Sequence, residues 1–210
     1  METLDRETLD RETLDRETFC ADAFRDEWEG VWNALRDGVA TRKSPFHTFT
    51  LATVNEEGEP DARTVILRGA DETERVIACQ GDIRSPKFRQ TRLHSTVVAV
   101  LYSVPDKRQI RLRGSAEIRH EDTHTEARWS RMYPMSREVY RTPFAPGELL
   151  SGDSSQISDP VPLEQAYHHF ATIQIKITEI DTLFLSADGH RRTRFDCSTG
   201  HPITAHRIAP

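Results

Sequence analysis

The sequence predicts a mainly β fold, an antiparallel β-barrel with peripheral helices. Beyond about residue 40, apolar and polar residues alternate in short segments, which is typical of strands with one buried face. Polar turn sequences such as NEEGEP and PDKR separate these segments. The strand segments do not alternate with crossover helices, so a parallel α/β sheet is disfavoured.

The chain is expected to have three parts. Residues 1–18 form a low-complexity acidic leader with ETLDR repeated three times, residues 19–40 an N-terminal helix, and residues 41–210 the main domain. The five-residue repeat makes no single apolar stripe on a helix, so a solvated leader is expected, with a partner-binding helix as the alternative. Residues 1–29 hold 11 of the chain's 34 acidic side chains and 4 of its 28 basic side chains. The rest of the chain therefore holds 23 acidic and 24 basic side chains. The main domain is therefore almost neutral.

The expected elements follow in a simple order. The N-terminal helix runs from about Phe19 to Val39 and buries one face that carries Trp28, Trp32 and Leu35. Strands are expected at 46–55, 63–70, 75–79, 95–103, 109–118, 171–177 and 181–186, and helices after Ser85 and over about 123–133. The first two strands form a hairpin, and a short turn separates the last two.

The composition excludes several classes of protein. No apolar run approaches the roughly 18 residues that a membrane-spanning helix needs, and METLDRETLD does not resemble a signal peptide. Cys20, Cys79 and Cys197 are widely spaced and fit neither a disulfide framework nor a zinc site. The nearly neutral main domain does not fit a nucleic-acid binder. A reducing cytoplasm is the expected location.

The segment IRSPKFRQTRL, residues 83–93, indicates an anion site. Ser85 and Pro86 predict a helix start, with the Ser85 hydroxyl capping a free backbone N–H. Arg84 and Lys87 flank this start, although cations are unfavourable at a helix N-terminus. A bound phosphate would use the helix dipole and neutralise both cations. An ordinary capped surface helix is the alternative.

Three further clusters of cations extend this pattern. In RTVILRG, Arg63 shares a face with Val65 and Leu67, and Arg68 lies on the opposite face. In KRQIRLRG, Gln109, Arg111 and Arg113 share a face, and GHRRTRF adds three more arginines. Solvated surface arginines would give the same pattern. Together, four cationic clusters in a neutral domain indicate a large anionic ligand with planar polar edges.

Seven short motifs follow one another along the chain: ATVNEEGEP, ARTVILRG, GDIRSPK, KRQIRLRG, SGDSSQIS, HRRTRF and HRIAP. Their order resembles that of the pyridoxamine 5′-phosphate oxidase superfamily over about residues 40–210. The most similar subgroup has no settled substrate. The resemblance implies an antiparallel FMN-binding split β-barrel, a flavin-dependent oxidoreductase, and a homodimer with FMN between the subunits. Position by position, it implies FMN contacts from Arg63, Thr64, Val65, Ile66, Arg68, Arg84, Ser85, Lys87, Gln109, Ser154 and Arg194. No residue is assigned as catalytic, because the flavin performs the redox chemistry.

Substrate contacts are less well matched to the family. The resemblance implies Arg68, Arg131, Arg137, His190 and Arg192 as substrate residues. The last two exchange the residue types of the family's Arg and His pair. Leu183 replaces a tryptophan that leans on the flavin, and Asp153 replaces a glutamine. The sequence therefore predicts a different small anionic substrate. A non-catalytic flavin-binding or sensing module, a true pyridoxamine phosphate oxidase, and a binder of haem or a deazaflavin remain alternatives.

HEDTH, residues 120–124, matches the pattern of a zinc protease, which needs both histidines on one face of a helix. The preceding strand runs straight into His120, and Asp122 or Thr123 is the expected helix cap. His120 would then lie before the helix. A polar strand-to-helix turn is therefore the preferred interpretation.

Overall fold

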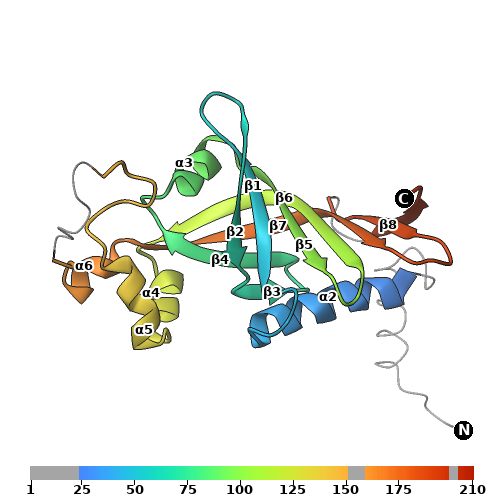
Figure 1. The fold of residues 1–210 in the computed structure, drawn as a ribbon, viewed down its shortest axis with the longest axis horizontal. Coiled ribbons are helices and arrows are strands. Elements are labelled where there is room, and N and C mark those ends of the chain that lie inside the picture. The colour runs from blue at the N-terminus through green and yellow to red at the C-terminus, as the bar shows by residue number, and fades with distance from the viewer. Residues whose placement is uncertain (1–23, 151–158, 199–202) are drawn as a thin grey trace, which may run out of the picture.

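The computed structural model describes residues 24–150, 159–198 and 203–210, and within them the predicted antiparallel β architecture is confirmed (Figure 1). One curved sheet has the strand order β2-β1-β5-β6-β7-β4-β3, with β8 pairing with β7 and β9 with β8. The strands are β1 (Thr48–Val54), β2 (Pro60–Ile66), β3 (Gly69–Asp71), β4 (Val76–Asp82), β5 (Thr96–Ser103), β6 (Arg108–His120), β7 (Phe170–Phe184), β8 (Arg191–Asp196) and β9 (Thr204–Ile208). All pairs are antiparallel.

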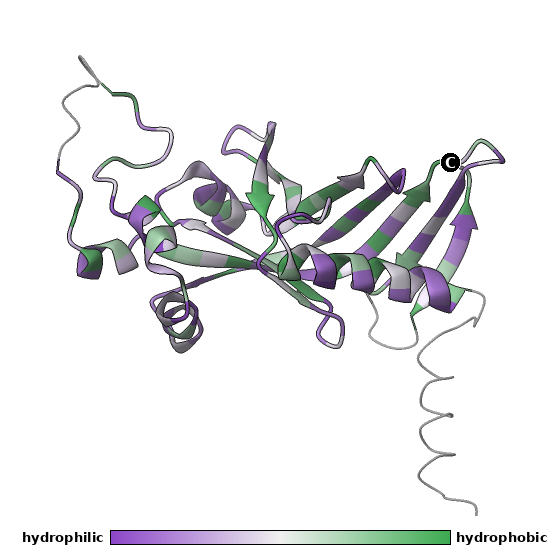
Figure 2. Cartoon of the chain, turned by 60° about the horizontal axis from the view of Figure 1, so that its bottom comes forward, coloured by the Kyte–Doolittle hydropathy of each residue, from purple (hydrophilic) through white to green (hydrophobic). Residues whose placement is uncertain are grey.

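The N-terminal helix α2 (Arg25–Ala40) packs its apolar face on the sheet. Trp28, Val31, Trp32 and Leu35 are buried at a spacing of three or four residues, and the helix shows the corresponding alternation of apolar and polar bands (Figure 2). Burying each of these side chains contributes roughly 1.5–3 kcal/mol. The predicted helix is confirmed here, but residues 1–23, which include the leader and the predicted start at Phe19, lie outside the described residues.

The predicted hairpin is confirmed by β1 and β2. Thr50 pairs with Thr64, and β1 pairs on its other side with β5. Val65 and Leu67 are buried, whereas Thr64 and Ile66 are exposed, as the alternation in RTVILRG predicts. The hairpin therefore presents Thr64 and Ile66 on the outer face of the sheet.

The prediction of two separate strands at 171–177 and 181–186 is wrong, because β7 is continuous. Residue 178 is a β-bulge: Gly114 pairs with Ile177 and Arg113 with Glu179, so Thr178 has no partner across β6. A Cβ on Gly114 would lie 2.2 Å from the Lys176 carbonyl oxygen, so only glycine allows this approach. Around the bulge, β7 changes its second partner from β4 to β8. The sequence also did not predict β8 and β9 as strands.

Short helices gather at one end of the sheet (Figure 1). They are α3 (Pro86–Leu93), α4 (Thr123–Ser130), α5 (Pro134–Arg137), the 3₁₀ helix η2 (Glu138–Tyr140) and α6 (Leu163–Tyr167). Tyr140, Ala166 and Phe170 form a small second core. Trp129 of α4 packs against Tyr140 and Phe170, so this core fastens α4, η2 and the start of β7 together. No helix of the described chain is long and apolar enough to cross a membrane.

Candidate functional site

A cleft of about 1230 Å³ lies between β2 and the helices at the end of the sheet. We call it the arginine cleft, because five cationic side chains line it: Arg42, Arg68, Lys87, Arg128 and Arg131. His47 and His124 also line it, and none of its described lining residues is acidic. None of the five cations takes part in an ion pair with another described residue. An unpaired cationic surface of this kind suits an anionic ligand.

Of the predicted FMN residues, the cleft brings together Thr64, Val65, Ile66, Arg68 and Lys87. The three residues from β2 provide a short apolar and hydroxyl-bearing wall. Arg68 follows the strand, and its backbone N–H donates to the Ala78 carbonyl at 2.7 Å, which holds this segment against β4. Burial lowers the pKa of Arg68, and the nearby charge of Arg42 acts in the same direction.

Lys87 supplies the one ammonium group among the described lining residues of the cleft, and it is half-buried. It belongs to the first turn of α3, which contains no acidic residue. Its Nζ donates to the Ser85 hydroxyl at 2.7 Å, which leaves two N–H donors for a ligand. A Cβ on Gly81 would lie 2.7 Å from this Nζ, so the absence of a side chain at Gly81 makes room for the ammonium. Burial lowers the pKa of Lys87, as expected for a cation that awaits a negative partner.

Ser85 does not cap the helix as predicted. It occupies the N-cap position with an extended backbone, but its side chain forms no capping bond. Instead, the hydroxyl donates to the Asp82 carbonyl at 2.6 Å and accepts from Lys87. The buried hydroxyl thus orients the ammonium, and Ser85 is a positioning residue.

Arg84 and Arg63 use their guanidinium groups within the protein, and neither lines the cleft. Arg84 forms a two-point ion pair with the buried carboxylate of Asp82 and donates to the carbonyls of Thr142 and Pro143. It therefore fastens the loop after η2 to the start of α3. Arg63 shares a face with Val65 as predicted, but it donates to Asp61, Thr53 and Gln90.

A second group of predicted residues lies elsewhere on the chain. Gln109 is on β6, and Arg192 and Arg194 are on β8; the two strands flank β7, and both are separated from β2 by at least two other strands. Arg192 donates to the buried Asp181 at 2.8 and 3.0 Å, and Arg194 lies 3.7 Å from Glu179. The exposed His190 accepts from the backbone N–H of Ser186. A single chain therefore does not bring the two groups together, and the predicted Ser154 lies outside the described residues.

The helical segment 123–137 supplies cations that the sequence only partly identified. Arg131 lines the cleft as predicted, but Arg137 stacks on Trp129 at 5.5 Å and donates to the Ser130 carbonyl. Trp129 itself packs against the second core. Arg128 was missed. The signal that could have found it is the three-residue spacing from Arg131, which places both on one face of a helix.

The HEDTH segment has the predicted geometry of a strand-to-helix turn. His120 ends β6, and Asp122 caps α4 by accepting from the backbone N–H of Thr125 at 2.8 Å. Only His124 is on the helix, where it lines the cleft. The segment therefore does not place two histidines on one helical face.

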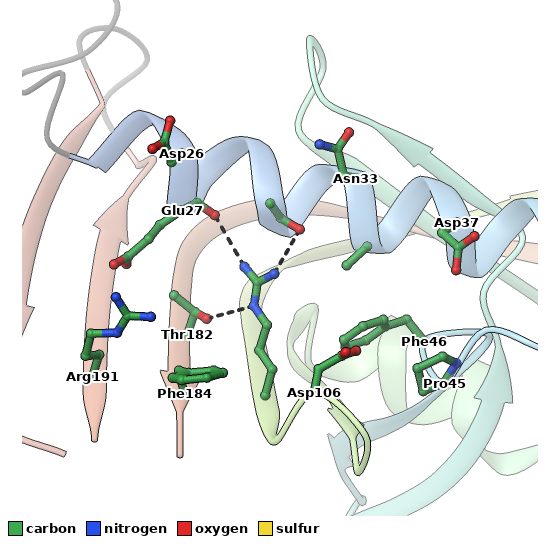
Figure 3. A pocket seen from close by; sticks show the side chains of 13 residues that line it. Asp26, Glu27, Asn33, Asp37, Pro45, Phe46, Asp106, Thr182, Phe184 and Arg191 are labelled. Atoms are coloured by element: carbon green, nitrogen blue, oxygen red, sulfur yellow. Dashed lines mark hydrogen bonds between the residues drawn. The ribbon is translucent and has the colours of Figure 1, made fainter. Parts of the chain in front are cut away.

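A second cavity, of about 650 Å³, lies between α2 and the ends of β6 and β7 (Figure 3). Asp26 and Asp37 line its α2 side, and Phe184 lines the sheet side. Arg108 crosses it and donates to the Glu27 and Gly30 carbonyls of α2 and to the Thr182 hydroxyl. Arg108 therefore anchors α2 to the sheet.

Replacement of Arg108 by methionine should destabilise the protein by about 2 kcal/mol, because α2 loses its charged hydrogen bonds to the sheet. For a chain of this size, the melting temperature should fall by roughly 4–8 °C. Arg191→Met is the matched control, since Arg191 is exposed and stacks on Phe184 at 5.1 Å without a hydrogen bond from its guanidinium to another described residue. Equal melting temperatures of the two variants would contradict the anchoring role.

The antiparallel sheet of this chain, with the cation-lined cleft at its end, is similar in fold to FMN-binding proteins related to pyridoxamine 5′-phosphate oxidase. Residues 27–120 match the family described as pyridoxamine 5′-phosphate oxidase, FMN-binding domain. Residues 27–120 are therefore similar to an FMN-binding domain of the pyridoxamine 5′-phosphate oxidase type, and the family resemblance seen in the sequence is confirmed.

Individual relatives agree with this assignment. The pyridoxine/pyridoxamine 5′-phosphate oxidase of Burkholderia multivorans is 31% identical over 119 residues, 57% of this chain and 52% of the relative. The enzyme of the same name from Burkholderia lata is 30% identical over 97 residues, 46% and 44% of the two chains. The chain thus spans about half the length of the curated relatives it matches.

Two solved structures share the fold. A pyridoxamine 5′-phosphate oxidase-related, FMN-binding protein from Nostoc punctiforme has a TM-score of 0.72 at 20% identity, covering 87% of this chain and 97% of its own. PhzG from Burkholderia lata, in complex with tetrahydrophenazine-1-carboxylic acid, has a TM-score of 0.66 at 18% identity, covering 100% and 99%. The predicted split barrel is confirmed by these similarities.

Proposed function

We propose that the protein is an FMN-dependent oxidoreductase that acts on a small anionic molecule other than pyridoxamine 5′-phosphate. The observation that carries the proposal is the arginine cleft, where five cations lie beside the β2 strand and none of the described lining residues is acidic. The strand belongs to the segment that matches an FMN-binding domain. The matched relatives are named as oxidases, which supports redox chemistry rather than cofactor binding alone.

The residues of the cleft fit FMN. Lys87, oriented by Ser85, would bind the phosphate, and Thr64 with Ile66 would lie along the flavin. Arg68 would stabilise the negative charge of the reduced cofactor. When bound, FMN supplies the centre that accepts and returns electrons. The protein itself would bind and orient FMN and the substrate and would provide positive charge.

A homodimer would complete the site. The β6–β8 group, Gln109, Arg192 and Arg194, is separated by intervening strands from the cleft of the same chain. A second copy that places this group over the cleft would explain why both groups match FMN contacts of the family. Light scattering should then give twice the mass of one chain, whereas a flavin-loaded monomer would contradict this arrangement.

The decisive experiment begins with the purified full-length chain. Flavin released by heating should be FMN, in a ratio of about one per chain. The loaded protein is then incubated anaerobically with anionic candidate substrates and with reduced nicotinamide cofactors, while flavin absorbance is followed. Bleaching by a substrate and recovery in air would establish an oxidase. Bound FMN that no compound reduces would instead indicate a non-catalytic module, and failure to bind FMN would overturn the proposal.

A further inference from the structure

We propose that Arg68, Arg128 and Arg131 form a second anion subsite in the arginine cleft, which binds a carboxylate of an aromatic substrate. This inference rests on the proposed function only in assigning the Lys87 end of the cleft to the phosphate of FMN. It adds Arg128 to the site and names the chemical class of the substrate.

The positive charge of the cleft can accommodate a second negative group besides the FMN phosphate. A phosphate monoester carries at most about two negative charges, which one end of the cleft would neutralise. The five cations therefore exceed what FMN alone can compensate. Arg68 and Arg128 are partly buried like charges that repel one another and lose hydration, so an anion bound between them would be favourable.

Arg128 is held where it can contribute to that subsite. Its Nη1 donates to the Arg68 carbonyl at 2.8 Å, which fastens α4 to the end of β2. A Cβ on Gly69 would lie 3.0 Å from Nη2, so the glycine leaves room for the guanidinium. Burial lowers the pKa of Arg128, and the charges of Arg131 and Arg68 add to this effect. The three guanidinium groups thus act on the same region of the cleft.

The geometry favours a carboxylate over a phosphate. Planar guanidinium groups match the two oxygens of a carboxylate, whereas phosphate sites also use backbone N–H groups at a helix start. Arg128 lies in the last turn of α4 and Arg131 at its C-cap, where free carbonyls rather than N–H groups are found. The group would therefore be bound through side chains alone.

The apolar side chains beside the subsite indicate the chemical nature of the rest of the substrate. Tyr133, Met135 and Val139 line the cleft beside Arg131 and are 78%, 84% and 68% exposed. Exposed apolar side chains beside a charged subsite suit a flat apolar body that carries the acid. Within the described chain, these side chains have no apolar partner of their own in either core. An aromatic carboxylic acid satisfies both features.

The test uses 1-naphthoate, its uncharged analogue 1-naphthamide, and 1-naphthyl phosphate as probes of the FMN-loaded full chain. Calorimetry should show that 1-naphthoate binds at least tenfold more tightly than the amide. Arg128→Met and Arg131→Met should each weaken 1-naphthoate binding about tenfold or more and leave amide binding unchanged. FMN affinity should change less than twofold. Arg89→Met removes a charge paired with Glu56 outside the cleft and should change neither.

Several outcomes would overturn the subsite. They are equal binding of 1-naphthoate and the amide, unchanged 1-naphthoate binding in both arginine variants, or tighter binding of the naphthyl phosphate. If Arg128→Met lowers the melting temperature, the exposed Arg131 provides the deciding variant. If FMN does not bind, the same titrations on the flavin-free protein test the subsite separately from the proposed function.

Discussion

Replacing Lys87 by methionine should weaken FMN binding by about one to two orders of magnitude and leave riboflavin binding nearly unchanged. Lys87 is the enclosed ammonium beside Gly81, and a charge-assisted hydrogen bond to phosphate contributes roughly 1.5–3 kcal/mol. Riboflavin lacks the phosphate, so it should not sense the change. Titration of the flavin-free protein with each flavin measures both affinities, and equal losses would contradict the phosphate assignment.

The Arg84→Met variant tests whether the Arg84 guanidinium binds the FMN phosphate or holds parts of the protein together. Its guanidinium holds Asp82 and two loop carbonyls, so its loss should lower stability and affect both flavins alike. The sequence alone assigned Arg84 and Lys87 to one phosphate clamp. A selective loss of FMN binding in Arg84→Met would restore that assignment and would show that the side chain turns toward the ligand.

The preference for FMN should also depend on pH. Only the protonated Lys87 attracts phosphate, and burial lowers its pKa in the flavin-free protein. FMN affinity should therefore fall as the pH rises through this lowered pKa, while riboflavin affinity stays level. Because the folded pKa lies below the unfolded one, the charged side chain disfavours folding at lower pH. Lys87→Met should consequently raise the stability of the flavin-free protein, as measured by thermal melting.

The protein should be a poor pyridoxamine 5′-phosphate oxidase, with an efficiency orders of magnitude below that of a typical enzyme. Arg137 stacks on Trp129, and Arg192 is paired with Asp181, so two of the predicted substrate residues are already engaged. A site that lacks several charged hydrogen bonds, each of about 1.5–3 kcal/mol, loses transition-state binding accordingly.

Steady-state oxidation of pyridoxamine and pyridoxine 5′-phosphates by the FMN-loaded protein measures this efficiency. A chemically reduced sample that regains its colour in air is the control that the flavin itself is competent. A kcat/KM of about 10⁴ M⁻¹s⁻¹ or more would contradict the prediction. It would mean that Arg128 and Arg131 bind the substrate phosphate in place of the family's residues.

Local patterns in the sequence were sufficient for most of the fold. Alternation of apolar and polar residues predicted the strands of the β1–β2 hairpin, and an apolar spacing of three or four residues predicted the buried face of α2. Each pattern depends only on which side of a single element faces the core. The long strand β7 was the exception. Thr178 looks like part of a turn, and only its neighbours on β6 and β8 make it a bulge.

The sequence by itself determined that the protein has an antiparallel barrel, an FMN-type set of motifs and an excess of cations near Ser85 and β2. Only the tertiary structure decided which of those cations are available. Arg84, Arg63 and Arg192 have the same residue type as Arg128 and Arg131, yet the first three meet Asp82, Asp61 and Asp181. Whether a guanidinium has a carboxylate partner depends on residues brought together by folding, and no local pattern records it.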